Sequence, residues 1–577
     1  MLVLALVLSL QLVSNPNVVS ANSAHLAPGA NSPSIPNYQW QFISPSEKAA
    51  VDASMKVIMN ERFKNITLNI HEDAGAPFIG RLQVTQRSTD FIYSAGWPGY
   101  YWDDYLAMTP SHSYSVYAPW SYVEAVQGQW NFKGPDSDYA DALSVKHGLT
   151  DFHIFLGPYY GPCCPDMAVP DWAKGLEQLA RSNSSDYEVL KSAMREYVEA
   201  VVSHFKGRIS QYELWWEANA WYGNGYWPLD RIIDIIKMEA TTIRAVDPAA
   251  RIYIDLVRMT PDAIQYENGK TLNNWTTEDF IQQLLAAGVP FDVIGLETHI
   301  GTGWAETAGD ISALYNWLIE LARFGKPLYI WEDGLESYLP PDWVAKQSPP
   351  WWKGTWHGTP SEAKQTEYMV AETLVYLGNP SVIGLHWMLL NDESPWSVNL
   401  SDDGVLYANG TRKMSFYALQ ALWNSLMVNE TVQSVNGVAT FKGLAGNYSI
   451  SAQGYEVEPS VVHVSEGKPS TFSLVLRSTT RTTTSITSTT PTTSGTVTPN
   501  RTGAVPSYIE YLAVIVVLGA IVVGSILISR KRARTPANAR ESISKMKDEK
   551  GVQFCINCGS KLQPESKFCN KCGSAQT

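Results

Sequence analysis

Short apolar runs alternate with longer amphipathic segments from residue 91 to residue 390, and this alternation limits the fold more than any other feature of the chain. The strand-like runs cover 91–96, 151–156, 212–217, 251–257, 291–300, 326–333 and 382–390, and the helix-like segments cover 187–205, 229–245, 277–287, 311–324 and 362–377. Strands separated by helices of this length predict βα units and a parallel sheet, and about eight such units close a barrel. We therefore predict an α/β protein with a (β/α)8 TIM barrel over 91–427.

Two of the predicted strands end in glutamates, Glu217 and Glu332. In a parallel barrel the carboxyl ends of the strands carry the chemistry. Two carboxyl groups there suit cleavage of a glycosidic bond, with Glu217 as acid/base and Glu332 as nucleophile of a retaining mechanism. The alternative is that each glutamate only caps a strand or pairs with an arginine. Glu336 is the nearest rival nucleophile.

Charge and aromatic content narrow the range of partners. The net charge of −13 argues against nucleic acid as a partner. The 21 Trp and 29 Tyr, many of them beside turn residues, favour a carbohydrate ligand, because sugar rings present flat C–H faces that stack on indoles.

Several motifs resemble those of glycoside hydrolase family 10 of clan A, whose known members are mainly endo-β-1,4-xylanases. The similarity runs from about residue 66 to residue 422 and rests on Trp120-x-x-x-Glu124, Glu217, Gly295-Leu296-Glu297-Thr298-His299, Glu332-Asp333, Trp387, Asp392 and Trp396. The resemblance implies catalysis without a cofactor. It also implies that the substrate-binding residues are Trp120, Trp216, Glu297, His299, Trp387 and Trp396.

The sequence departs from this family where the sugar would be held. Trp216 stands where the family has Asn, Glu297 replaces a Gln, and residues 115–120 lack the family's sugar-binding Lys and Asn. We therefore expect a membrane-anchored, extracellular retaining β-glycosidase that acts on a β-linked polysaccharide or oligosaccharide other than plain xylan. The alternative is a catalytically weak carbohydrate-binding or envelope protein at the cell surface.

The segments around the barrel have distinct compositions. Residues 1–21 are typical of a signal peptide, 46–90 of a β-rich lead-in, and 428–477 of a small β-sandwich. The Ser/Thr-rich segment 478–507 is typical of an extended stalk. Residues 508–529 predict a single transmembrane helix, and the basic linker 530–553 after it places the following residues in the cytoplasm. The Asn-x-Ser/Thr sequons all precede this span, which fits an external barrel.

The tail 554–577 carries two Cys-x-x-Cys pairs, Cys555 with Cys558 and Cys569 with Cys572. Four thiolates at this spacing predict a tetrahedral structural zinc site, similar to a zinc ribbon. Disulfides are the rival interpretation, but the predicted cytoplasmic side is reducing. We hypothesise that this ribbon docks a cytoplasmic protein partner.

Overall fold

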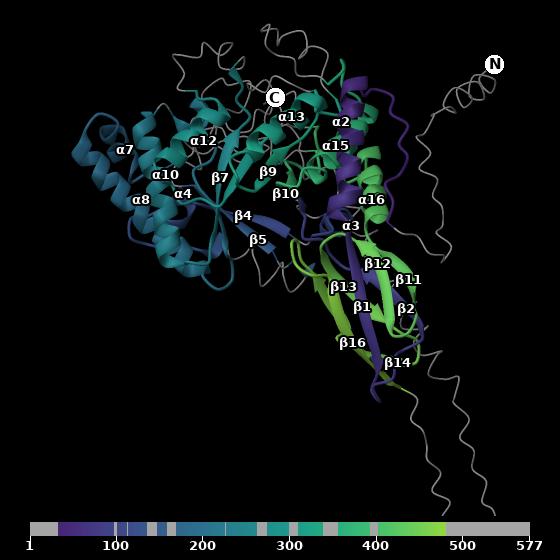
Figure 1. Cartoon of the computed structure of the whole chain (residues 1–577). Coiled ribbons are helices and arrows are strands. Elements are labelled where there is room, and N and C mark those ends of the chain that lie inside the picture. Colours follow the sequence, from purple (N-terminus) through teal and green to yellow (C-terminus); the bar gives the residue numbers. More distant parts are fainter. Residues whose placement is uncertain are drawn as a thin grey trace, which may run out of the picture. The chain divides into compact units, whose positions relative to one another are not determined.

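The computed structural model in Figure 1 describes residues 33–96, 101–111, 113–134, 147–149, 151–157, 169–225, 227–261, 274–298, 310–338, 356–392 and 402–479. The predicted signal peptide, stalk, transmembrane segment, basic linker and zinc ribbon all lie outside these residues. None of the helices in the described part of the chain combines the length and the hydropathy of a membrane span.

Eight parallel strands form the central sheet, in the order β3-β10-β9-β8-β7-β6-β5-β4. The strands are β3 (Ile92–Ala95), β4 (Ser113–Pro119), β5 (Asp151–Gly157), β6 (Gln211–Glu213), β7 (Arg251–Val257), β8 (Val293–Glu297), β9 (Leu328–Asp333) and β10 (Val382–Trp387). This order matches the order along the chain once the sheet is closed into a ring, so the predicted (β/α)8 barrel is confirmed.

The ring closes between its first two strands, β3 and β4. The hydroxyl of Ser111 accepts a hydrogen bond from the backbone N–H of Tyr93 (2.8 Å) and donates one to the Tyr93 carbonyl oxygen (2.8 Å). The Tyr105 hydroxyl also donates to the carbonyl oxygen of Ser113, at the start of β4. Side chains therefore join the two strands where the ladder of backbone hydrogen bonds is interrupted.

Helices follow the strands and cover the outside of the ring (Figure 1). They are α3 (Trp102–Met108), α4 (Trp120–Val123), α7 (Lys174–Ala180), α8 (Ser184–Phe205), α9 (Trp221–Asn224), α10 (Leu229–Val246), α12 (Thr277–Ala286), α13 (Ile311–Ala322), α15 (Glu362–Leu377) and α16 (Met414–Leu426). Four isoleucines of α10, Ile232, Ile235, Ile236 and Ile243, recur at helical spacing and are buried. A separate cluster, which includes Phe155, Tyr253, Tyr329 and Trp331, fills the inside of the barrel.

Two four-stranded sheets form a second module, in the orders β12-β1-β16-β14 and β11-β2-β13-β15. Their strands are β1 (Lys64–Glu72), β2 (Gly80–Gln86), β11 (Asn429–Ser434), β12 (Val438–Gly443), β13 (Gly446–Ser451), β14 (Tyr455–Glu458), β15 (Val461–Val464) and β16 (Thr471–Ser478). The inner residues of both sheets share one hydrophobic cluster. The lead-in 46–90 and the segment 428–477, which we treated as separate parts, thus contribute strands to the same sheets.

The lead-in strands β1 and β2 occupy inner positions in the two sheets. β1 lies between β12 and β16, and β2 lies between β11 and β13. Without β1 and β2 each sheet would be divided, with unpaired backbone groups along the two strands that they join. The module therefore needs strands from the chain before the barrel and from the chain after it.

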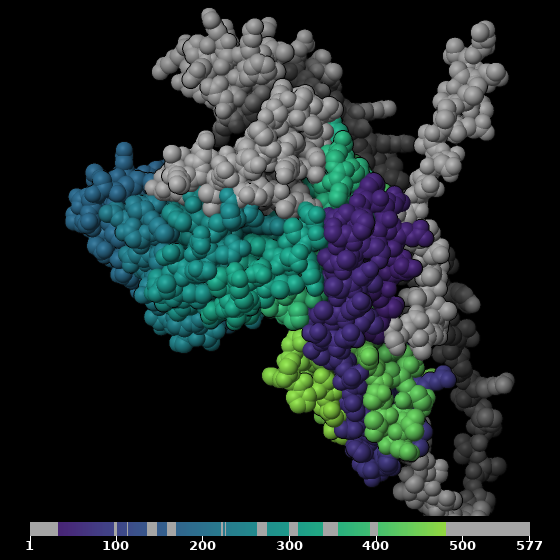
Figure 2. All heavy atoms as spheres, turned by 45° about the horizontal axis from the view of Figure 1, so that its top comes forward, coloured from purple at the N-terminus to yellow at the C-terminus, as the bar shows by residue number. Residues whose placement is uncertain are grey.

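Helix α2 (Pro45–Val57) leads into this module and packs on the barrel. Ser44 and Glu47 form a capping box at its first turn. Glu47 is fully buried, and its carboxylate also accepts hydrogen bonds from the N–H of Ile311 and from the indole N–H of Trp356. Helix α2 packs against α13 and α15, and in Figure 2 its purple surface adjoins the teal and green surface of the barrel. The π-helical turn η1 (Ile58–Arg62) follows α2.

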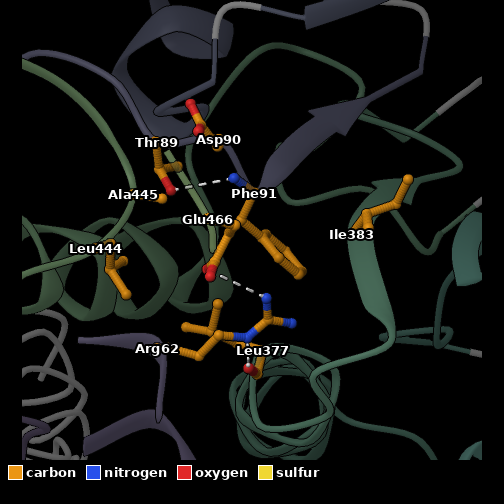
Figure 3. Close-up of a pocket in the computed structure, with 9 residues that line it drawn as sticks. All are labelled: Arg62, Thr89, Asp90, Phe91, Leu377, Ile383, Leu444, Ala445 and Glu466. Atoms are coloured by element: carbon orange, nitrogen blue, oxygen red, sulfur yellow. Dashed lines mark hydrogen bonds and ion pairs between the residues drawn. The ribbon is translucent and has the colours of Figure 1, made fainter. Parts of the chain in front are cut away.

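Arg62 joins α15 to the module (Figure 3). Its guanidinium donates to the carbonyl oxygens of Leu377 (3.0 Å), Asn379 (2.7 Å) and Val382 (2.6 Å), and it lies 3.7 Å from Glu466. The hollow beside it has a volume of about 60 Å³, far below the roughly 300 Å³ of a small ligand pocket. The contacts of Arg62 are therefore structural, since they satisfy carbonyls at the end of α15.

Replacing Arg62 with methionine is expected to lower the free energy of unfolding by roughly 2–4 kcal/mol, because the carbonyls of Leu377 and Val382 lose the Arg62 donor and that of Asn379 keeps only the N–H of Val382. The matched control is Lys64→Met. Lys64 pairs with the same Glu466 at 2.7 Å, but at a more exposed position, so its loss should cost less than about 1 kcal/mol. Denaturant unfolding of both variants measures the difference. Equal losses would contradict this role of Arg62.

Candidate active site

A β-bulge in β9 places Glu332 at the mouth of the barrel. Gly295 pairs with Tyr329 and Leu296 with Ile330, but Glu297 then pairs with Glu332, so β9 has one extra residue at Trp331. The same shift occurs against β10, where Leu385 pairs with Ile330 and Trp387 with Asp333. Strict alternation would turn Glu332 toward the helices with Ile330. The bulge turns it to the inner face, beside Glu297.

Gly295 provides the space that this arrangement needs inside the barrel. A Cβ atom at this position would lie 2.3 Å from Cδ1 of Trp331 and 2.4 Å from the carbonyl oxygen of Ile254. Only glycine therefore lets the Trp331 indole occupy the interior one residue before Glu332.

Glu217 lies in the turn that follows β6, the fourth strand of the ring. It has a φ of 48°, in the left-handed region that a glutamate rarely adopts. Gly223 of α9 packs directly against it, since a Cβ atom there would lie 2.2 Å from the Glu217 carbonyl oxygen and 2.5 Å from its Cβ. The surrounding structure thus fixes a strained backbone at this half-buried glutamate, as is typical of functional sites.

Four neighbouring strands each present a carboxyl group to the inside of the barrel: Glu213 on β6, Asp255 on β7, Glu297 on β8 and Glu332 on β9. Glu213 pairs with Tyr253, two residues before Asp255; Asp255 pairs with Gly295, two residues before Glu297; and Glu297 pairs with Glu332. The row therefore rises diagonally from the interior to the mouth. The exposed fractions are 0% for Glu213 and Asp255, 2% for Glu297 and 7% for Glu332.

Trp216 connects this row to the turn that carries Glu217. Its indole N–H donates a 2.7 Å hydrogen bond to Oε1 of Glu297. Because Trp216 directly precedes Glu217, the bond holds the turn after β6 over the end of β8. Two carboxyl groups, one in the turn after the fourth strand and one at the carboxyl end of the seventh, can support acid/base and nucleophilic chemistry on one substrate.

Comparison with known proteins decides the family. The family model for glycosyl hydrolase family 10 matches residues 119–421, which is more than half of the 577 residues. The chain belongs to glycosyl hydrolase family 10. A zinc-ribbon domain model matches residues 554–576. Both resemblances drawn from the sequence motifs are confirmed.

Relatives of this family 10 chain include endo-1,4-beta-xylanase A of Phanerodontia chrysosporium, which is 24% identical over 238 residues, or 40% of this chain and 50% of that protein. The chain thus spans about half the length of this curated relative. Among solved structures, xylanase 10B of Thermotoga maritima is 16% identical with a TM-score of 0.40, covering 65% of this chain and 98% of that one. A family 39 glycoside hydrolase of Bacteroides cellulosilyticus WH2 is 14% identical with a TM-score of 0.41, covering 66% and 74%.

Two of the tryptophans predicted to hold sugar in this family 10 site lie in the protein core. Trp120 is 0% exposed, and its indole N–H donates to Glu124 (2.7 Å). Trp387 is 1% exposed, and its indole N–H donates to the hydroxyl of Tyr93 (2.6 Å). Neither ring presents a free face for stacking, so the expectation of sugar platforms at Trp120 and Trp387 is corrected. Trp216 and Glu297 do lie at the site, whereas His299, Trp396 and the four tail cysteines fall outside the described residues.

The sequence motifs did not point to Glu213 and Asp255. Each is a carboxyl group inside an otherwise apolar strand, and each stands at the alternation position of the barrel-filling residues. A charged residue at an inward position of a buried strand is costly unless it has a partner. A carboxyl group at an inward position of an apolar strand was therefore the sequence signal that could have identified both residues.

A hydrogen-bonded network supports Glu332 from the helix side. Asp333 points outward, where its Oδ2 accepts from the Tyr376 hydroxyl of α15 (2.8 Å), and this hydroxyl contacts Oγ1 of Thr298 (2.9 Å). The N–H of Thr298 donates to the carbonyl oxygen of Glu332 (2.8 Å). Burial, followed by the charge of Asp333, raises the pKa of Glu372 well above its usual range. The carbonyl of Glu332 is thereby held by the residue that follows β8.

Proposed function

We propose that this family 10 chain is a retaining β-glycosidase that hydrolyses a β-linked polysaccharide or oligosaccharide, in the manner of an endo-1,4-β-xylanase. The observation that carries the proposal is the bulge in β9, which turns Glu332 inward at the carboxyl end of the seventh strand. Glu217, in the turn after the fourth strand, supplies the second carboxyl group. Paired carboxyl groups across a sugar bond are the usual requirement for glycoside hydrolysis.

In the first step the Glu332 carboxylate attacks the anomeric carbon, and a covalent glycosyl–enzyme ester forms. As the bond from that carbon to the leaving oxygen breaks, Glu217 donates its proton to this oxygen. In the second step Glu217 takes a proton from water, and the water oxygen displaces Glu332 from the anomeric carbon. Glu217 is then protonated again, Glu332 is ionised, and the sugar retains its configuration.

The substrate is proposed to differ from unsubstituted xylan. Trp216 occupies the position before the acid/base, and the single N–H donor of its side chain already bonds to Glu297 at 2.7 Å. An indole at this position presents a flat apolar face rather than an amide, and so favours stacking on a sugar ring over a bond to a sugar hydroxyl.

Reducing-sugar release from a panel of β-glucans, mannans and substituted and unsubstituted xylans tests the proposal. Turnover of at least one β-linked polymer is expected, with unsubstituted xylan not the best. If the chain binds these polymers but releases no sugar from any of them, it is instead a surface carbohydrate-binding protein. That second function is favoured by the same aromatic content and needs no catalysis.

The tail is proposed to lie on the cytoplasmic side of the membrane and to bind one zinc ion through Cys555, Cys558, Cys569 and Cys572. The zinc-ribbon match at residues 554–576 and the apolar segment 508–529 with its basic flank support this. Protease added to intact cells should remove the barrel and leave a protected carboxyl-terminal fragment that contains zinc. A protected barrel with a digested tail would reverse the topology, and a protected fragment without zinc would exclude the metal site.

A further inference from the structure

Glu213 and Asp255 lie next to each other inside the barrel, on the adjacent parallel strands β6 and β7. Both side chains are fully buried. In the diagonal row of carboxyl groups they occupy the two innermost positions, followed by Glu297 and Glu332 toward the mouth. They are therefore close enough to the proposed catalytic glutamates to influence their charge, but are too deep to touch a substrate.

The two groups can satisfy each other. No hydrogen bond of normal geometry from an N–H or O–H group of the described residues reaches any of their four oxygen atoms. Each carboxyl group instead interacts with the other, and Asp255 also interacts with the Glu297 side chain and the backbone N–H of Glu217. Two carboxylates cannot form a hydrogen bond, and two adjacent buried negative charges repel strongly. A single proton between them removes one charge and supplies the missing donor.

We propose that Glu213 and Asp255 share one proton and act as a charge-setting pair, which keeps the acid/base Glu217 protonated to higher pH. This inference rests on the proposed function, because it assigns a role at the same site. Neither residue contacts the reacting atoms, so both are positioning residues that act on Glu217 through charge.

The direction of the effect follows from the order in which the pair loses protons. Burial, with the nearby Glu332 charge as the next cause, raises the pKa of Asp255 to about 7. Burial, and then the charge of Asp255, raises the pKa of Glu213 well above its usual range. Below about pH 7 the pair is neutral; above it, Asp255 is ionised and Glu213 keeps its proton. Glu217 is close enough to the pair for a Coulomb interaction. The negative charge that appears on Asp255 therefore disfavours ionisation of Glu217.

Several other titratable groups interact with the pair. They are Tyr117 from β4, Glu297 from β8, Glu332 from β9 and Glu217 from the turn after β6. On β5, Phe155 is in register with Glu213, and His153 lies two residues earlier, against Tyr253. Burial, with the charge of Glu332 as the next cause, raises the pKa of Tyr117 well above its usual range, so this phenol stays neutral. Asp255 is thus the group of the pair whose charge changes near neutral pH.

The test compares two isosteric substitutions in the full chain. Asp255→Asn removes the charge and should move the alkaline limb of the kcat/KM profile to lower pH by on the order of half a pH unit. Glu213→Gln keeps an amide donor for Asp255 and should leave this limb in place.

The control is Glu239→Gln. Glu239 is a buried glutamate on α10 with a pKa raised by burial to about 8, and its Oε2 accepts from the N–H of Trp215. This control should leave the limb unmoved. An unmoved limb in Asp255→Asn, or an equal shift in Glu239→Gln, would overturn the proposal.

Infrared difference spectra separate this inference from the proposed function, because they need no substrate. At pH 8 the spectrum of Glu213→Gln should lack one protonated-carboxyl band that the unmodified chain and Asp255→Asn both show. If Glu213→Gln retains every such band, the pair does not share a proton. If the band is lost but no polymer is hydrolysed, the pair does share a proton, but both its charge-setting role and the proposed function are excluded.

Discussion

Glu332→Ala is expected to lower kcat/KM for every substrate by roughly 10⁴-fold or more, because the covalent intermediate can no longer form. Azide added to this variant should not restore retention. Instead, it can enter the space left by the carboxylate and give the glycosyl azide of inverted configuration. Product analysis by chromatography and NMR distinguishes these outcomes. A variant with activity near that of the unmodified enzyme would exclude Glu332 as the nucleophile.

Glu336→Gln is the matched control for that experiment, because Glu336 is the nearest other glutamate along the chain. It is 2% exposed, and its Oε2 accepts from the N–H of Asp402 (3.1 Å). Burial, and then the charge of Asp403, raises its pKa well above the usual range. A carboxyl group that holds its proton is a poor nucleophile, and glutamine is an isostere of that protonated form. Activity within about tenfold of the unmodified enzyme is therefore expected.

Glu217→Ala is expected to affect substrates according to their leaving groups. Natural glycosides need a proton on the departing oxygen, so their hydrolysis should slow by roughly 10²–10⁴-fold. Aryl glycosides with good leaving groups should still form the glycosyl–enzyme at nearly the original rate. Azide should then accelerate the second step and give a glycosyl azide of retained configuration. Equal losses on both substrate classes, without rescue by azide, would contradict the assignment of Glu217 as acid/base.

The alternation of strand and helix patterns was enough to predict the barrel, because each pattern reflects local periodicity and burial. The strands of the lead-in could be recognised in the same way, from the alternation around Ile66 and Leu82. Their partners could not. β1 pairs with strands near residues 440 and 475, and only the packing of two sheets on one core decides such a long-range pairing.

At the site, both glutamates were predicted at strand ends, but β6 ends at Glu213 and Glu217 lies in the turn after it. The inward turn of Glu332 could not be predicted either. Its position in the alternation was outward, and the bulge that reverses it depends on the neighbouring strands and on the space at Gly295. The misplaced sugar platforms have a similar cause. Trp120 and Trp387 stand near strand ends, yet their indoles have buried partners, Glu124 at the end of α4 and Tyr93 on the neighbouring strand β3, which no local pattern specifies.

The configuration of the first product tests the central claim most directly. Proton NMR of a β-linked substrate during the first minutes of hydrolysis, before the anomers equilibrate, distinguishes a retaining from an inverting enzyme. The account predicts the β-anomer, because two displacements at the anomeric carbon, by Glu332 and then by water, restore the original configuration. Initial release of the α-anomer would mean that water attacks the substrate directly, and would contradict the assignment of Glu332 as the nucleophile.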